Sequence, residues 1–269
     1  MEQELPQDKS IIDANPTKEL FISMLTRDVS LRDAIGDLLD NSVDGALALR
    51  PDGNYKGLKV EIELDVEKDH FRITDNCGGI PVSVARDHAF RFGRSEGAVT
   101  TGHSVGVFGI GMKRALFRLG KWFKVESIAK DSSFVMEVDV EKWKQDTKEE
   151  SARETNDQDN GKERNKENWQ FNFSRFEEDL EQEYPEEKRG TIVTVAKLND
   201  VVLETFRIKN DISKLIEELQ REHLYSIDKG LEITINKKRL EAPELKLLVS
   251  DKLKTAYWKN LEGPVKVRI

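Results

Sequence analysis

Three polar side chains recur at helical spacing between residues 31 and 50. Asp37, Asn41 and Asp44 lie four and three positions apart, so one face of a helix would carry all three. Carboxylate and amide oxygens in a row suit a magnesium ion bound with a nucleotide, because magnesium prefers oxygen ligands. A solvated acidic helix face has the same pattern, and this segment alone leaves both interpretations open.

A second candidate site begins where a strand-like run ends. Asp75 closes the run HFRITD and is followed by Asn76, Cys77 and two glycines. A carboxylate there can accept a hydrogen bond from an exocyclic amine, such as the amino group of adenine, while Gly78 and Gly79 leave room for a flat base. An ordinary turn that contains aspartate is the alternative.

Residues 93–111 are rich in glycine, serine and threonine, and we expect a mobile loop there. The loop ends in GVFGIG, from Gly106 to Gly111, and a helical pattern follows. Glycines let the backbone approach phosphates closely, and the amides at a helix N-terminus favour anions. The spacing matches neither the dinucleotide fingerprint nor the phosphate loop of nucleotide triphosphatases, so a flexible surface loop is the alternative.

The pair Gly190-Thr191 opens another strand-like run, TIVTVAKL. A threonine hydroxyl at that position could hold a water molecule beside Asp75. The alternative is that Thr191 is simply a β-branched residue in a strand, where such residues are common.

These four motifs occur in one order along the chain: the acidic-amide helix, the strand-end D-x-x-G-G, the glycine-rich segment and the Gly-Thr strand. In that order they resemble the GHKL ATPase superfamily, which includes the DNA gyrase B subunit, the ninety-kilodalton heat-shock chaperone, histidine kinases and MutL; MORC ATPases are similar too. The resemblance covers about residues 16–200. It implies the Bergerat fold, an α+β two-layer sandwich in which helices cover one face of a mixed, mostly antiparallel sheet and ATP binds between the helices and the glycine segment.

The resemblance also assigns roles to individual residues. Asn41 would coordinate magnesium through its amide oxygen, and Asp44 would lie among the nucleotide ligands on the same helix. Asp75 would bind the adenine amino group, with Gly79 and Ile80 beside the base. The remaining contacts would come from the Gly-Thr strand, the glycine segment and one lysine beyond it: Thr191, Gly106, Val107, Phe108, Gly109, Ile110, Gly111 and Lys113. For this lysine, a plain surface position is the alternative.

Two positions depart from the family pattern. The family usually has a glutamate four residues before the magnesium asparagine, as general base for the attacking water, and this chain has Asp37 there. Because the shorter side chain reaches less far, we expect slow hydrolysis, or hydrolysis only in a closed dimer. Cys77 stands where related sequences have a glycine; we interpret it as a packing residue, since no activating base is nearby.

Composition limits the classes of protein to consider. The chain has 269 residues, of which 37% are hydrophobic and 35% charged, which predicts a soluble protein with a sizeable core. We see no membrane-length apolar run, no signal segment and a single cysteine, and we therefore predict a cytoplasmic protein. A net charge of −8 argues against strong nonspecific binding of nucleic acid, although a local basic patch is left open.

Periodicity indicates the elements that must position these residues. We predict a helix over 16–27 with Leu20, Phe21, Met24 and Leu25 inward, and a central helix over 31–50 that is capped by Ser30. A hairpin over 58–75 and strands over 122–130, 133–143 and 191–198 follow. The predicted domains are an N-terminal arm (1–15), the ATP-binding domain (16–205, with a polar, mobile insertion at 144–168) and the start of a transducer-like domain (206–269) that continues beyond this chain.

The function that the resemblance implies is a magnesium-dependent ATPase that acts as a conformational switch. ATP would close the glycine segment and pair two chains into a homodimer, hydrolysis would reopen them, and an effector domain or protein client would respond. A lysine or arginine of the transducer domain would reach the γ-phosphate from beyond residue 269. The alternatives are a GHKL-type protein kinase, although no phosphoacceptor-histidine helix precedes the first predicted helix, and a nucleotide-binding interaction module without catalysis.

Overall fold

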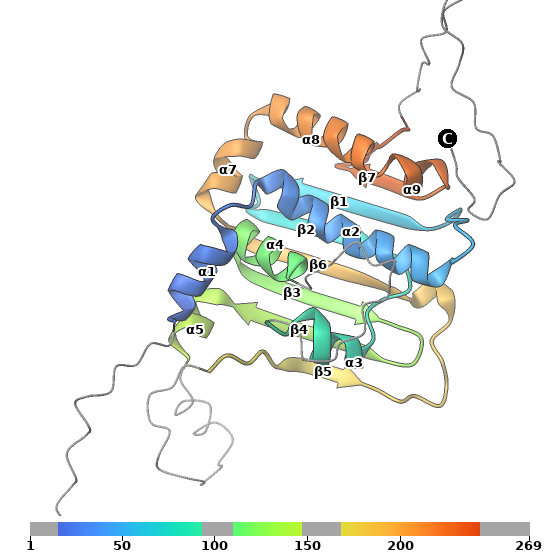
Figure 1. The fold of residues 1–269 in the computed structure, drawn as a ribbon, viewed down its shortest axis with the longest axis horizontal. Helices are drawn as coiled ribbons and strands as arrows, with labels where there is room; N and C mark the ends of the chain where they lie inside the picture. Colours follow the sequence, from blue (N-terminus) through green and yellow to red (C-terminus); the bar gives the residue numbers. More distant parts are fainter. Residues whose placement is uncertain (1–15, 93–109, 147–167, 243–269) are drawn as a thin grey trace, which may run out of the picture.

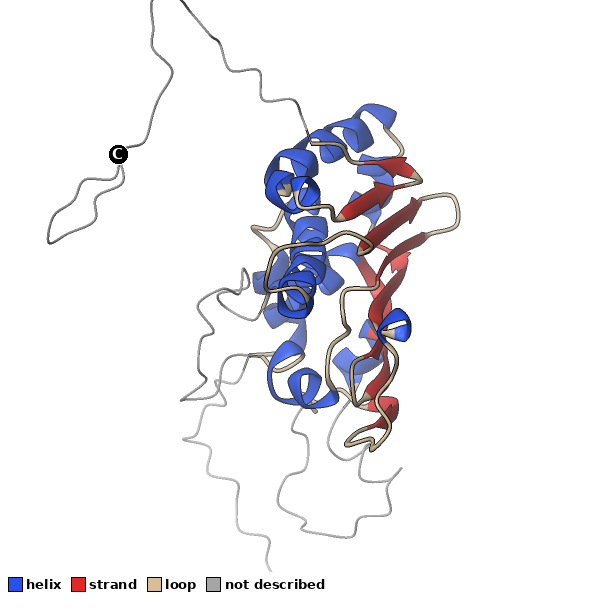
Figure 2. Cartoon of the chain, turned by 90° about the vertical axis from the view of Figure 1, so that its right-hand side faces the viewer, coloured by secondary structure: helices blue, strands red, loops and turns tan. Residues whose placement is uncertain are grey.

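The computed structural model describes residues 16–92, 110–146 and 168–242. The predicted arm, most of the glycine segment and the middle of the predicted insertion lie outside these residues. The described chain forms two layers, an eight-stranded sheet and a layer of helices gathered on one of its faces (Figures 1 and 2). This arrangement confirms the predicted α+β sandwich.

The sheet has the order β5-β4-β3-β6-β2-β1-β7-β8. All neighbouring strands are antiparallel except β1 and β7, which are parallel, so the sheet is mixed and mostly antiparallel as predicted. Its strands are β1 (Lys59–Asp65), β2 (His70–Asp75), β3 (Gly120–Ile128), β4 (Ser133–Asp139), β5 (Phe173–Glu177), β6 (Gly190–Leu198), β7 (Glu232–Ile235) and β8 (Lys238–Arg239).

The helical layer is built mainly from α2 and α4, which pack against each other (Figure 1). The helical elements are α1 (Lys18–Thr26), α2 (Leu31–Leu49), α3 (Val82–Val84), the π-helical turn η1 (Ala85–Ala89), α4 (Gly111–Leu119), α5 (Val140–Gln145), the 3-10 turn η2 (Glu186–Lys188), α7 (Asp200–Phe206), α8 (Lys209–Glu222) and α9 (Leu224–Asp228). No helix in the described ranges is both long enough and apolar enough to cross a bilayer.

The central helix α2 begins where the sequence predicts. Ser30 and Asp33 form a complete capping box, in which each side chain accepts a hydrogen bond from the backbone of the other. The apolar stripe below it is buried in the core that α2 shares with the sheet, and includes Leu31, Ala34, Ile35, Leu38, Leu39 and Ala46. The polar stripe of α2 is therefore held in a fixed orientation by the packing of the opposite face.

The predicted inward face of α1 is partly wrong. Leu20 and Met24 are 51% and 63% exposed, whereas Lys18 is buried. Its ammonium group donates hydrogen bonds to the carbonyl oxygens of Trp143 and Asp146 at the end of α5. The interior beside α1 therefore contains carbonyl groups, which require a hydrogen-bond donor rather than an apolar side chain.

The run predicted as one strand over 133–143 divides into β4 and α5. The Asp139 side chain accepts a hydrogen bond from the backbone of Lys142 at 3.2 Å and caps the helix. This helix reaches into the predicted insertion, whose two ends join where Asn168 donates a side-chain hydrogen bond to Asp146 at 2.9 Å. Residues 147–167 lie outside the described part of the chain.

Strand β7 joins the sheet of the preceding domain by pairing in parallel with β1. Leu219 of α8 and Ile233 of β7 are buried in the same core as the helices α2 and α4. The chain after residue 205 thus shares the sheet and the core as far as residue 242, and its relation to a transducer domain stays a prediction.

Candidate functional site

Asp75, the predicted adenine ligand, is contacted by three other segments of the chain. Strand register pairs it with Thr191 of β6, and α2 supplies Ser42 from the helical layer. One carboxylate oxygen, Oδ1, accepts hydrogen bonds from the backbone N–H groups of Cys77 (2.9 Å) and Thr191 (3.3 Å), and Oδ2 accepts from Ser42 Oγ (2.8 Å). Burial raises the pKa of Asp75, and these three hydrogen bonds oppose that rise. Since a carboxylate offers about four acceptor positions, room remains for one more donor.

A small cavity lies beside this carboxylate. It encloses about 30 Å³ and brings together four residues predicted to bind nucleotide: Asn41, Asp75, Ile80 and Thr191. Ser42 and Met112 also line it. A volume of this size holds about one water molecule, so a purine base would enter only if neighbouring side chains moved.

The turn after Asp75 packs against β3 through Gly79. Gly79 has φ +74°, and a Cβ atom there would stand 2.0 Å from the carbonyl oxygen of Ile128. The next residue, Ile80, donates its backbone N–H to Ser127 Oγ at 2.6 Å. Glycine is thus required at position 79 by backbone packing, and Ile80 is held at the cavity wall.

Cys77, which the sequence analysis interprets as a packing residue, is buried in the same turn. Burial is the main cause that raises the pKa of its thiol, and the charge of Asp75 adds to it. A thiol that resists ionisation is a poor nucleophile, so the packing interpretation agrees with the structure.

Asp37, the predicted general base, forms an ion pair with Arg114 of α4. The two guanidinium nitrogens Nε and Nη2 lie 2.5 and 2.8 Å from the carboxylate oxygens Oδ2 and Oδ1. The carboxylate also lies beside the first residue of α4, because a Cβ atom on Gly111 would be 3.3 Å from it. The predicted base therefore stands at the beginning of the helix that follows the glycine segment.

Asn41 is oriented by its own helix. Its Nδ2 donates a hydrogen bond to the backbone carbonyl of Asp37 at 2.7 Å, which leaves the amide oxygen as the group available to a cation. The described residues contain no cluster of three or more His, Cys, Asp or Glu side chains that could hold a metal ion. Magnesium bound with a nucleotide needs few protein ligands, because phosphate oxygens and waters complete its shell, and one amide oxygen fits that role.

The acidic row of α2 carries an unusual carboxyl group. Burial raises the pKa of Asp40 to about 6, and the negative charges of Asp37, Asp44 and Glu222 add to the shift. Asp44, a predicted nucleotide ligand, therefore lies near enough to act electrostatically on Asp40. This concentration of negative charge favours binding of a cation at the exposed side of the helix.

Of the predicted phosphate ligands, Gly106, Val107, Phe108 and Gly109 lie outside the described residues. Ile110 is the N-cap of α4 and makes no side-chain capping hydrogen bond, and Gly111 begins the helix. Lys113 is buried, and its ammonium group donates hydrogen bonds to the carbonyl oxygens of residues 89 and 91 at 2.9 and 2.6 Å. These contacts tie α4 to η1, and a phosphate role for Lys113 stays a prediction.

Two residues of this site, Ser42 and Arg114, were not predicted from the sequence. A signal for Ser42 was present, because it occupies a position on the apolar stripe of α2, between Leu38 and Ala46 at helical spacing, where a polar side chain needs a partner. Arg114 had no comparable signal, since its partner is 77 positions earlier in the chain.

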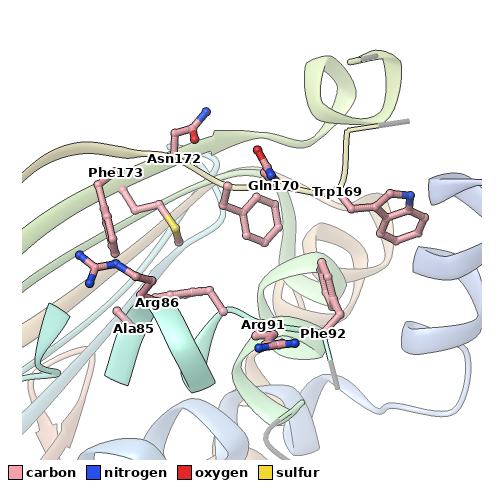
Figure 3. A pocket seen from close by; sticks show the side chains of 11 residues that line it. Ala85, Arg86, Arg91, Phe92, Trp169, Gln170, Asn172 and Phe173 are labelled. Atoms are coloured by element: carbon pink, nitrogen blue, oxygen red, sulfur yellow. The ribbon is translucent and has the colours of Figure 1, made fainter. Parts of the chain in front are cut away.

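A larger cavity, of about 680 Å³, lies elsewhere on the helical face of the sheet (Figure 3). Arg86 and Arg91 line it together with aromatic side chains that include Phe92, Trp169 and Phe173. None of the residues predicted to bind nucleotide is among its lining residues, so this cavity is separate from the one beside Asp75.

A comparison with known families finds a match to this chain. The model of the histidine kinase-, DNA gyrase B- and HSP90-like ATPases matches residues 29–170, which include α2, Asp75 and α4. Thr191 lies beyond the matched range. A comparison with curated proteins finds no match. The match extends over more than half of the chain, which therefore belongs to the family of histidine kinase-, DNA gyrase B- and HSP90-like ATPases.

Proposed function

We propose that this chain binds magnesium–ATP at the Asp75 cavity and along the face of α2, and that it hydrolyses the nucleotide slowly. The observation that supports this most is the hydrogen bonding of Asp75. A buried carboxylate without a cationic partner is unfavourable, and here three neutral donors hold it in one orientation beside a cavity. Such an arrangement suits recognition of an uncharged amine, as the adenine amino group is.

The metal and the phosphates would bind further along α2. Asn41 would give magnesium one oxygen ligand, and the acidic row with Asp44 would favour the cation. The amides at the start of α4, from Ile110 and Gly111 onward, would face the phosphates, because a helix N-terminus favours anions. The magnesium ion would supply charge neutralisation of the phosphate oxygens.

Asp37 would act as the general base. It would accept a proton from a water molecule whose oxygen attacks the γ-phosphorus, while the bond from that phosphorus to the β,γ-bridging oxygen breaks to give ADP and phosphate. Aspartate has the required chemistry, but its reach is shorter than that of glutamate, and we therefore propose slow turnover.

At the level of the whole protein we propose a cytoplasmic ATP-dependent switch. ATP binding would close the glycine segment and join two chains as a homodimer, and hydrolysis would separate them. The chain from residue 206 would begin a transducer-like domain that passes this change to an effector. Family membership supports these steps, because the family includes ATPases of the gyrase B and HSP90 type.

Isothermal titration with a nonhydrolysable magnesium–ATP analogue tests the binding step. We expect one site per chain, loss of binding on chelation of magnesium, and weaker binding of the corresponding GTP analogue, which lacks the exocyclic amine at the same ring position. Asp75→Asn should lose affinity for the ATP analogue, whereas Asp52→Asn, in the exposed turn after α2, should not. Absence of both heat and thermal stabilisation with the wild-type chain would refute the proposal.

A further inference from the structure

Two consecutive basic residues in the first turns of α4 lie in different surroundings. Lys113 is buried and directs its ammonium group to backbone carbonyl oxygens of residues 89 and 91. Arg114 points instead to the carboxylate of Asp37 on α2 and keeps 33% of its side chain exposed. Of the two cations, Arg114 is thus the one that solvent and a ligand can reach near the predicted base.

The contact between Arg114 and Asp37 is a forked ion pair. Two guanidinium nitrogens, Nε and Nη2, meet two carboxylate oxygens at 2.5 and 2.8 Å. A guanidinium fork fits phosphate oxygens as well as carboxylate oxygens, since both present a pair of acceptors in one plane. The carboxylate therefore occupies a position that a phosphate group could also take.

The position of this pair is what connects it to the proposed phosphate site. The carboxylate lies 3.3 Å from the place where Gly111 would carry a Cβ atom, so the group that the guanidinium contacts lies beside the first residue of α4. A triphosphate that arrived there would meet an existing negative charge on Asp37, and the guanidinium neutralises that charge.

We propose that Arg114 binds the terminal phosphate of the nucleoside triphosphate by exchanging its partner. In the nucleotide-free chain the guanidinium group pairs with Asp37, and on binding of the triphosphate it transfers to oxygens of the γ-phosphate. The exchange releases both carboxylate oxygens of Asp37, one of which then accepts the proton of the attacking water. This inference rests on the proposed function, and it assigns a γ-phosphate contact to a residue of the ATP-binding domain itself.

The exchange has a consequence that a merely structural ion pair lacks. ADP has no γ-phosphate, so Arg114 would stay on Asp37 in the ADP complex, and its removal would change the affinity for ATP more than the affinity for ADP. Removal of the Asp37 carboxylate, which competes with the phosphate, would raise the affinity for ATP, because the guanidinium group would already be released.

Titration calorimetry with magnesium ADP and with a nonhydrolysable magnesium–ATP analogue tests the exchange. We expect Arg114→Ala to lower the affinity for the analogue roughly 10-fold or more and to change the affinity for ADP less than about 2-fold. Asp37→Asn should strengthen binding of the analogue, and this gain should vanish in the double variant with Arg114→Ala. Arg32→Ala, which removes an exposed arginine–aspartate pair on the same helix, is the matched control and should leave both affinities unchanged.

Other outcomes overturn the inference. If Arg114→Ala lowers the affinities for ADP and for the analogue equally, the ion pair has only a structural role. If the affinity for the analogue is unchanged, Arg114 does not contact the phosphate. If Arg114→Ala does not fold, as judged by circular dichroism, Arg114→Gln serves the same comparison. If the wild-type chain binds neither nucleotide, both the proposed function and the exchange are refuted. If it binds both nucleotides with equal affinity, the exchange alone is refuted.

Discussion

Two carboxylates of this molecule sit in contrasting environments at the two ends of the proposed nucleotide site. Asp75 is buried and is held by the N–H groups of two residues and the hydroxyl of a third, all of them uncharged. Asp37 is 16% exposed and faces a guanidinium group. Within the described part of the chain, the environment of Asp75 offers no charged partner, whereas that of Asp37 offers one that fits both oxygens.

Asp75 is fixed in position, whereas Asp37 can change its partner. Neutral donors that belong to the backbone of β6 and to the turn after β2 cannot move without breaking the sheet, so Asp75 is preorganised. The Asp37–Arg114 contact involves side chains alone, so its partners can separate without breaking the sheet, and a ligand that offers the guanidinium group new acceptors would compensate for the lost ion pair. We infer a rigid end that recognises the base and an adjustable end that responds to the phosphates.

Gly79→Ala should have the largest effect, and it tests whether the position of Asp75 depends on the backbone packing of the turn that follows β2. Gly79→Ala should lower the free energy of unfolding by roughly 3–5 kcal/mol, because its Cβ atom would meet the Ile128 carbonyl oxygen at 2.0 Å and its φ is +74°. Urea unfolding measures this. Gly57→Ala is the matched control and should cost about 1 kcal/mol. Gly57 has φ +90°, and apart from its chain neighbours no atom of the described residues lies within 4 Å of the added Cβ. Equal losses would mean that strain in φ alone, not the contact with β3, fixes the turn.

Substitutions of Asp37 should change the rate of ATP hydrolysis more than the free energy of unfolding. Asp37→Ala should reduce ATP hydrolysis roughly 100-fold or more, because a positioned general base contributes that much. Asp37→Glu should retain or increase turnover, since it restores the usual reach. Release of phosphate measures both, with the exposed Asp28→Ala as control. Unchanged hydrolysis in Asp37→Ala would show that the general-base assignment is wrong.

The sequence predicted most of the rigid end because its signals are local. The capping box at Ser30, the hairpin that leads to Asp75 and the strand that starts at Thr191 each follow from patterns within a few residues. Their assembly then follows from the antiparallel sheet, whose register sets Asp75 opposite Thr191. A polar residue on an apolar helix face, Ser42, was also within reach of such reasoning.

Other features depend on contacts between distant segments, and no periodicity encodes them. The burial of Lys18 depends on carbonyl groups at the end of α5, more than a hundred positions away, and the predicted inward face of α1 did not include it. Arg114 looks like a surface residue in the sequence, and only the packing of α4 on α2 brings it to Asp37. The addition of β7 beside β1 is likewise a long-range pairing that strand propensity alone does not predict.

Asp75→Asn should have a smaller effect and should separate the role of Asp75 in nucleotide binding from its role in stability. Asp75→Asn keeps the shape of the side chain and one oxygen acceptor, but it removes the negative charge. We expect the affinity for the ATP analogue to fall roughly 10- to 100-fold, as for loss of a hydrogen bond to a charged group, with no decrease in the free energy of unfolding, because the charged form is disfavoured by burial. Calorimetry and urea unfolding measure the two quantities. A loss of stability with unchanged affinity would make Asp75 a structural residue.

We expect the smallest effect at Asp40 of α2, where the measured quantity is the pH dependence of the free energy of unfolding. Its pKa, raised to about 6 by burial and by Asp37, Asp44 and Glu222, lies above that of an unfolded aspartate. The unfolded chain therefore releases this proton first, and the free energy of unfolding falls as pH rises from about 4 through 6. Because 34% of the side chain is exposed, we expect a loss of only about 1 kcal/mol.

Asp40→Asn should remove that slope, so the variant should gain stability relative to the wild type as pH rises from 4 to 7. His223, whose Nδ1 lies 3.9 Å from Asp40 Oδ1, titrates in the opposite sense, because burial lowers its pKa to about 4 and its protonation at low pH opposes folding. Since His223 is present in both proteins, its contribution cancels in the difference, and a His223→Gln background tests that cancellation. Urea unfolding at several pH values measures the difference. A difference independent of pH would show that the acidic row of α2 is solvated like an ordinary helix surface, and would remove the electrostatic argument for a cation there.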